Sequence, residues 1–169
     1  MALATCILQS LKFTAITSNI GTNIVMSTIR ATTSSITTVL RYIISESSNN
    51  SEHIKHFLTQ SDLNFTITTI QAFINEQNIN DSQKAIATAL EGVSEILTTI
   101  HDDLQSIRTE CEYHKTRYFS SYRSFTWSKN IETLESHNNI LKHRYNLLFE
   151  LLKIQKFSNK ENTQNLLTQ

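Results

Sequence analysis

Between residues 86 and 118, hydrophobic residues recur at alternating spacings of four and three. The repeat consists of Ile86, Leu90, Val93, Leu97, Ile100, Leu104, Ile107, Cys111, His114 and Tyr118. A 3.5-residue repeat places its members on one face of a helix and is typical of helices that pack along their length. The preceding segment Asn80–Ser82 has residue types that cap helix N-termini. We therefore predict one helix from about 82 to about 120.

A second repeat of the same kind follows in the last third of the chain. Its members are Ile131, Leu134, Asn138, Leu141, Tyr145, Leu148 and Leu152. Further apolar residues widen this stripe, as expected where a helix contacts more than one partner. These are Ile140, Leu147, Leu151 and Ile154. We predict a helix from about 130 to about 157, followed by a polar and frayed tail over 158–169.

The two predicted helices are separated by only about ten residues, so they should be antiparallel neighbours. Folding the chain about the middle of this connection brings Leu104 opposite Tyr145. The same register places Cys111 near Asn138, which would form one polar layer close to the tip of the hairpin. The sequence thus predicts a long antiparallel, coiled-coil-like helical hairpin over 82–157.

The remaining half of the chain also favours helices, because it lacks Pro and carries few of the turn residues that sheets need. Residues 51–77 fit one bent helix or two short ones, with Ser61 and Asp62 able to cap the second. Residues 1–50 are rich in Thr and Ser and fit helices at about 2–18 and 20–46, with Gly21 as the weak point. The apolar stripe of the second of these is Val25, Ile29, Thr32, Ile36, Val39 and Ile43. We predict a single all-α bundle domain over 1–157, in which these helices pack on the hairpin.

The composition limits the compartments in which the protein is expected and the classes of partner that it is expected to bind. The 15 basic and 15 acidic residues cancel, so no overall field attracts the chain to nucleic acid or to anionic lipid. Residues 51–107 are nevertheless net acidic and residues 108–169 net basic, which suits self-association or packing of one part on another. Two Cys, one in each half, fit a reducing, intracellular compartment. The first residues do not resemble a secretory signal, and the uncharged stretch over 13–29 is too polar for a membrane span.

Few residues are arranged for chemistry. Cys111 and His114 share one helical face near His137, an arrangement that could bind zinc, but no second motif of this kind completes it. Asp102 and Asp103 fall outside the apolar seam, as expected for a solvated helix face. The sequence contains no phosphate-binding Gly-rich loop, no nucleophile elbow and no zinc-protease motif. We therefore expect no enzymatic activity, no metal, no cofactor and no small-molecule substrate.

The connection between the two helices of the hairpin combines aromatic and basic residues. The candidate interface residues are Arg117, Phe119, Tyr122, Arg123, Phe125, Trp127 and Lys129. Exposed aromatic residues beside Arg are enriched at protein–protein hot spots. The same mixture can stack on single-stranded nucleic acid, insert into a membrane surface, or fold under the connection as core. These four interpretations stay open at the level of sequence.

Two segments carry a resemblance to known proteins. The pattern "YHKTRYFSSYRSF…LESHNNILKHRYNLLFELLKI" over 113–154 and the segment "TSNIGTNIVMSTIRATTSSITTV" resemble parts of uncharacterised α-helical proteins of large nucleocytoplasmic DNA viruses. The resemblance implies a virus-encoded helical protein of the particle or the replication compartment. It transfers no functional residues to this chain.

These observations together predict a non-enzymatic structural or adaptor protein that acts through protein contacts, with a protein partner or with further copies of itself. One alternative is a membrane-acting protein whose Thr-rich N-terminal helices rearrange and insert. Another is an accessory factor that binds nucleic acid through the aromatic and basic connection.

Overall fold

The computed structural model describes residues 3–45, 52–76, 84–116 and 127–167, and within them the side chains of 21–45, 52–76, 84–113 and 127–158. The described residues form five helices and no strand, so the predicted all-α fold class is confirmed. The helices are α1 (Leu3–Ser45), α2 (Glu52–Gln60), α3 (Leu63–Glu76), α4 (Lys84–Thr116) and α5 (Ser128–Leu167).

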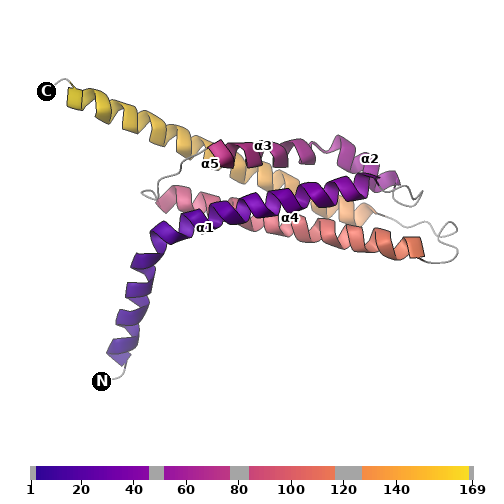
Figure 1. The fold of residues 1–169 in the computed structure, drawn as a ribbon, viewed down its shortest axis with the longest axis horizontal. Coiled ribbons are helices and arrows are strands. Elements are labelled where there is room, and N and C mark those ends of the chain that lie inside the picture. Colours follow the sequence, from indigo (N-terminus) through magenta and orange to yellow (C-terminus); the bar gives the residue numbers. More distant parts are fainter. Residues whose placement is uncertain (1–2, 46–51, 77–83, 117–126, 168–169) are drawn as a thin grey trace.

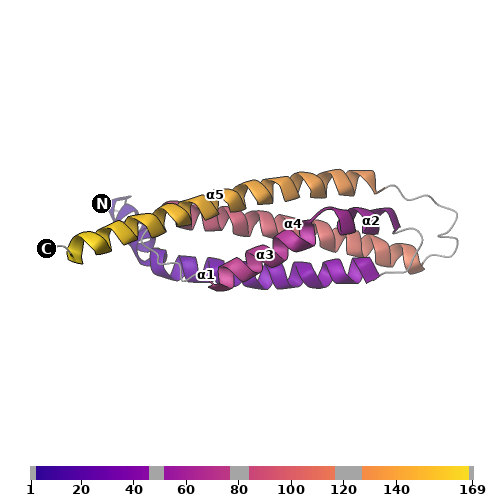
Figure 2. The ribbon, with the colours of Figure 1, turned by 90° about the horizontal axis from the view of Figure 1, so that it is seen from above.

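The bundle consists of three long helices, with the two short ones laid over one face (Figures 1 and 2). Helix α4 is central and packs against both α1 and α5. Helix α3 packs on α1 and also touches α5. Helices α1 and α4 run in the same direction, whereas α5 runs back along α4 (Figure 1). This arrangement makes α4 and α5 antiparallel neighbours.

The predicted stripes form the core. On α4, every described member of the first repeat from Ile86 to Cys111 is at most 2% exposed. On α5, the repeat is buried or half-buried throughout, and the buried members include Leu134, Leu141 and Leu148. The core therefore follows the 3.5-residue pattern, because a helix that buries one continuous stripe removes the most apolar area from water.

Helix α1 has the inward face that its sequence predicts, with two exceptions. Ile29 and Ile36 are buried, but Met26 and Thr33 take the buried places expected for Val25 and Thr32, which are only half-buried. The buried Thr33 hydroxyl donates to the carbonyl oxygen of Ile29 at 2.9 Å. A small side chain that satisfies its own hydroxyl within the helix can be buried at low cost.

The register between α4 and α5 differs from the prediction. The Nδ1 atom of His137 lies 2.6 Å from Oδ2 of Asp103, whereas the prediction placed Leu104 opposite Tyr145. The pairing is therefore displaced by about one heptad. A 3.5-residue repeat brings apolar layers together again after seven residues, so the repeat alone cannot choose between registers. Helix α4 ends at Thr116 and α5 begins at Ser128, and both boundaries lie earlier in the chain than predicted. The centre of the connection therefore also lies earlier, so each residue of α4 faces an earlier residue of α5 than predicted.

The predicted polar layer of Cys111 and Asn138 is also wrong. Asn138 instead reaches the junction between α2 and α3, where its Nδ2 donates to the carbonyl oxygen of Ser61 at 3.2 Å. At this junction Asp62 has a φ of 54°, a left-handed conformation that Asp tolerates better than most residues. Residues 52–76 therefore form two short helices with the break at Ser61 and Asp62, as one of the two sequence interpretations proposed.

Two predicted helix boundaries are corrected. Helix α1 continues through Gly21, whose φ is not positive, instead of breaking there. Figure 1 shows the N-terminal part of α1 turned away from the bundle. Helix α5 continues to Leu167, so most of the predicted polar tail is helical. The end of α5 extends past the beginning of α4 in both views (Figures 1 and 2).

Candidate protein-interaction surface

The predicted aromatic and basic interface lies mostly outside the described residues. Arg117, Phe119, Tyr122, Arg123 and Phe125 fall in the undescribed connection, so their role stays a prediction.

The structure places the other two candidates. Trp127 is 1% exposed and belongs to the core cluster, so for this residue the core interpretation holds and its candidacy as an exposed interface residue is wrong. Its carbonyl oxygen accepts the first hydrogen bond of α5, from the backbone N–H of Ile131 at 2.9 Å. A large indole at the helix start can cover the end of the apolar seam, which explains its burial. Lys129 is exposed.

Lys129 lies on a small polar groove between α4 and α5, with a volume of about 280 Å³. Asn130 donates from Nδ2 to Oε2 of Glu110 at 3.4 Å on this groove. Two turns further along α5, His137 donates from Nδ1 to Asp103, and both side chains are about a quarter exposed. The contact of His137 with Asp103 joins the net-acidic segment 51–107 to the net-basic segment 108–169, whereas Asn130 and Glu110 both lie in the net-basic segment.

His137 therefore lies about two helical turns from the level of Cys111, and the predicted convergence of His137 on Cys111 is not found. Cys111 is buried, and the side chain of His114 lies outside the described residues. Within the described part of the chain, no three His, Cys, Asp or Glu side chains are close enough to hold a metal ion.

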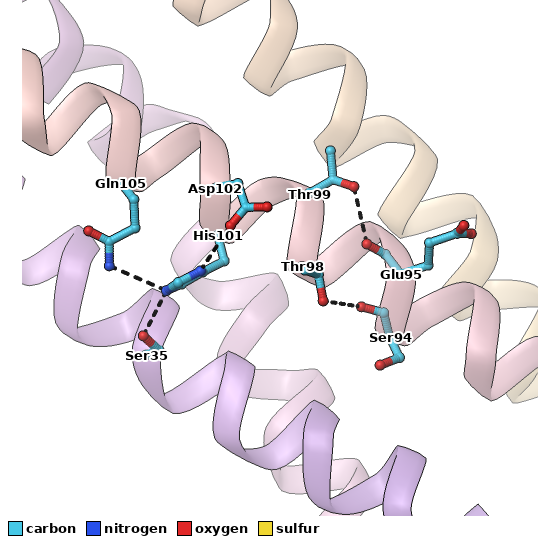
Figure 3. A network of polar contacts seen from close by, with 8 residues as sticks. All are labelled: Ser35, Ser94, Glu95, Thr98, Thr99, His101, Asp102 and Gln105. Atoms are coloured by element: carbon cyan, nitrogen blue, oxygen red, sulfur yellow. Dashed lines mark hydrogen bonds and ion pairs between the residues drawn. The ribbon is translucent and has the colours of Figure 1, made fainter. Parts of the chain in front are cut away.

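A second polar network joins α1 to α4 around His101 (Figure 3). Its Nε2 lies 2.8 Å from Oγ of Ser35, and its Nδ1 lies 3.5 Å from Oδ1 of Asp102. Gln105 donates its amide N–H to the same Nε2 at 3.3 Å, which makes Nε2 an acceptor and assigns the ring hydrogen to Nδ1. The order Ser–His–Asp is that of a hydrolase triad.

The surroundings of His101 do not suit catalysis. Asp102 is 74% exposed and only loosely orients the ring. Ser35 sits inside α1, where the neighbouring backbone N–H groups are used by the helix and cannot form an oxyanion hole. Gln105 competes with Ser35 for the same imidazole nitrogen. This network is best described as a polar contact between two packed helices.

Exposed apolar side chains concentrate on α5. Ile140, Leu147 and Ile154 are 39%, 53% and 65% exposed. They are seven residues apart, so they lie on one face of the helix. The sequence predicted that these residues contact a second partner helix, yet within this chain they remain open to solvent. A stripe of this kind is a recognised sign of an interaction site.

An apolar groove lies beside this stripe, with a volume of about 630 Å³. Its α4 wall includes the small residues Ala85, Ala89 and Gly92 together with Lys84 and Thr88, and its α5 wall is formed by Arg144, Leu147 and Leu151. Such a wall allows a further helix to approach closely, because small side chains keep little volume between the backbones. We call the groove together with Ile140, Leu147 and Ile154 the α4–α5 face.

Arg144 borders this face and fastens α5 to α4. Its Nη1 donates to the carbonyl oxygen of Gly92 at 2.6 Å and lies 3.0 Å from Oε2 of Glu95. A Cβ atom at Gly92 would lie 3.7 Å from Cδ of Arg144, an ordinary contact distance. An alanine would therefore fit at position 92 without displacing Arg144.

On its other side, α5 is covered by α3. Phe73 meets the ring of Tyr145 edge-on, with centroids 5.6 Å apart, and the ring of Phe149 at 5.8 Å. Lys153 places its Nζ 4.8 Å from the centroid of Phe149. Burial raises the pKa of the Tyr145 hydroxyl above its usual 10.0. These contacts explain the partly covered aromatic residues of α5, and they leave the stripe of the α4–α5 face unexplained.

The sequence named the stripe residues but missed the groove. The signal was present as small residues at 85, 89 and 92, whose spacing places them on one face of α4. Such a pattern indicates a groove only when the fold shows that the neighbouring helix does not cover that face.

Comparison of the chain with family models, with curated proteins and with solved structures finds no match. Among the described residues, no helix is both long enough and apolar enough to cross a bilayer.

Proposed function

We propose that this chain is a non-enzymatic structural or adaptor protein that acts through protein–protein contacts, with the α4–α5 face as its contact surface. The observation that carries the proposal is the row of Ile140, Leu147 and Ile154, exposed on one side of α5 beside an apolar groove. Burying apolar area contributes about 25 cal/mol per Å². A partner that covers this row and fills the groove removes this apolar area from water, which stabilises the complex.

The polar side chains support contact over catalysis. His101, His137 and Arg144 all bridge α4 to a neighbouring helix, and each engages its partners within the chain. Groups held in this way fix the rigid shape of the bundle. A rigid, preformed surface binds a partner with less loss of conformational entropy than a flexible one.

Further features belong to the same proposal. We take α4 and α5 to be a coiled-coil-like hairpin, and the protein to be an oligomer or part of a larger assembly in a reducing, intracellular setting. The resemblance to viral helical proteins would place that assembly in a virus particle or replication compartment. The undescribed connection with Arg123 and Phe125 would then be a second contact site.

Affinity capture with quantitative mass spectrometry tests the proposal. Tagged wild-type chain is compared with Leu147→Glu/Ile154→Glu, which places two charges on the α4–α5 face. Phe65→Glu is the matched control, because Phe65 is 71% exposed on α3 and lies off this face. We expect specific binding, to another protein or to added chain, that the double variant loses and the control keeps.

The proposal fails if the wild-type chain binds neither another protein nor itself above the level of an unrelated helical bundle. It also fails if both variants bind as well as wild type. Circular dichroism of each variant before the capture confirms that the helix content is unchanged.

A further inference from the structure

We infer that residues 3–16, called the N-terminal segment below, fold back and cover the α4–α5 face, so that a partner must displace them to bind. This inference rests on the proposed function and adds its regulation. The structure shows an open form, in which the part of α1 before Gly21 turns away from the other helices (Figure 1). In the closed form the same segment lies in the apolar groove.

The N-terminal segment carries an apolar stripe of its own. With about 3.6 residues per turn, its Leu, Ile and Ala residues all fall on one side of the helix, whereas Gln9 and Lys12 fall outside that side. The members of the stripe are Leu3, Ala4, Ile7, Leu8, Leu11 and Ala15. A helix of this length owes its stability mainly to packing of such a stripe against a partner. The groove beside α5 offers an apolar surface for that packing.

The segment leaves the bundle at the end where the groove lies. Helices α1 and α4 run in the same direction, and Ser35 of α1 contacts His101 of α4. Fourteen residues earlier on each helix, Gly21 lies at about the level of Ala87. The α4 wall of the groove is formed by residues within 84–92, so the groove begins at this level.

The lengths of the segment and of the exposed stripe also agree. Ile140 and Ile154 are fourteen residues apart, which is about 21 Å along α5. A helix over residues 3–16 has about the same length. When extended, residues 17–21 span up to about 17 Å, more than the diameter of about 10–12 Å of the helix α4 that they must pass.

The levels of the helices determine which residues meet. The contact of Asp103 with His137 places the bend at about the level of Lys153 on α5. From there the folded-back segment runs parallel to α5. Leu11 lies six residues from the end of the segment's helix at about residue 17, and Leu147 lies six residues from Lys153. The closed form therefore brings Leu11 to the level of Leu147.

The residues at the bend suit a helix that can end there. A Cβ atom at Gly21 would meet nothing within 4 Å, so no close packing requires a glycine at this position of α1. Glycine destabilises a continuous helix relative to Ala, whereas Gly and Asn are favoured where a helix ends. Asn19 and Gly21 both stand directly before Thr22, which is 5% exposed and belongs to the packed part of α1.

Cysteine cross-linking within one chain tests the closed form. In a Cys6→Ser background, Leu11→Cys and Leu147→Cys would come within the distance that a disulfide requires. We expect mild oxidation to form this disulfide within the monomer, seen as a faster band on a non-reducing gel. The matched control combines Leu11→Cys with Phe65→Cys, because Phe65 is exposed on α3 and lies off the face. It should cross-link at least tenfold more slowly. Equal rates for the two pairs, or disulfides that form only between chains, would overturn the inference.

The bend is tested in the same pair of cysteines by adding Gly21→Ala. Because Ala favours the continuous helix of the open form, we expect the intramolecular cross-link to form about fivefold more slowly. Circular dichroism before oxidation confirms that the variant is folded. An unchanged rate would contradict a fold-back at Gly21.

Affinity capture then connects the closed form to binding. The reduced pair Leu11→Cys/Leu147→Cys should capture the protein that the wild type captures, and the oxidised pair should lose it until dithiothreitol is added. Equal capture by the two forms would show that the segment does not mask the face. A wild-type chain that captures nothing while the cross-link forms overturns the proposed function and keeps the fold-back. A chain that captures protein through Leu147 and Ile154, yet cross-links no faster than the control, overturns the fold-back and keeps the proposed function.

Discussion

Replacing Asn138 by Asp tests whether one buried amide holds the junction between α2 and α3. Asn138 is 5% exposed, and its Nδ2 donates to the carbonyl oxygen of Ser61. Its Oδ1 has no hydrogen-bond partner among the described residues. The substitution exchanges the NH₂ group for an oxygen of nearly the same size, so it creates no cavity. It removes the donor and places two acceptors against each other.

The expected cost follows from these contacts. A hydrogen bond between neutral groups contributes about 0.5–1.5 kcal/mol, and an unsatisfied buried group costs about 1–3 kcal/mol, more when it is charged. We therefore expect Asn138→Asp to lower the free energy of unfolding by about 3 kcal/mol at pH 7.5. Burial raises the pKa of the introduced carboxyl above its value in the unfolded chain. The loss in free energy of unfolding should consequently grow as the pH rises from the pKa of this carboxyl in the unfolded chain through its pKa in the folded chain. The loss should shrink at low pH, where the protonated carboxyl can donate to the carbonyl oxygen of Ser61.

Urea denaturation followed by circular dichroism at pH 4.5 and pH 7.5 measures both quantities. Asn139→Asp is the matched control, because Asn139 is exposed and the chemical change is identical. The control should stay within about 0.5 kcal/mol of wild type at both pH values. A variant at Asn138 that is as stable as wild type at pH 7.5, or equally impaired at both pH values, would refute the assigned role of the amide.

Four further predictions follow from individual contacts. Trp127→Ala should lower the free energy of unfolding by about 3–5 kcal/mol, and in the wild type this sole tryptophan should emit at a short wavelength that shifts to the red on unfolding. A double-mutant cycle of Asp103→Asn and His137→Gln should give a coupling of about 1 kcal/mol, since the pair is close but partly exposed. Gly21→Ala should raise the free energy of unfolding by about 0.5–1 kcal/mol in a thermal or urea melt, because a Cβ meets nothing within 4 Å there. Tyr145 should make stability fall in an alkaline titration above pH 10, because the unfolded chain ionises first; Tyr145→Phe should remove this contribution.

The sequence predicted which faces of the helices are buried, because burial follows a period that can be counted. Leu97 and Ile100 on α4, and Leu141 and Leu148 on α5, all lie in the core where the repeats placed them. The break at Asp62 was one of two interpretations of residues 51–77, since local residue types favour a cap there. Interactions between residues near in sequence, or repeated along it, can be inferred without knowing the rest of the fold.

Contacts between distant residues could not be predicted in the same way. Asn138 was placed correctly in the apolar stripe, but its partner Ser61 lies at the junction between α2 and α3 and belongs to no pattern. The candidate surface was predicted only in part for a related reason. Ile140 and Ile154 were recognised as extra apolar positions, yet their exposure depends on how the other helices are arranged.

The register of α4 and α5 connects the core to the proposed function. Apolar layers alone would accept a shift of one heptad, but such a shift would separate Arg144 from Gly92 and Glu95, and His137 from Asp103. These polar contacts therefore select one register among several with similar apolar packing.

The selected register also determines what the surface offers. It sets Leu147 beside the small residues of α4, so that the centre of the exposed stripe coincides with the groove. A shift of one heptad would bring Ile140 or Ile154 to the groove instead. Variants that weaken the contact of His137 with Asp103 should thus impair binding of the partner proposed for the α4–α5 face without altering any residue of that face. The position of the proposed contact surface is in this sense a consequence of polar contacts between α4 and α5.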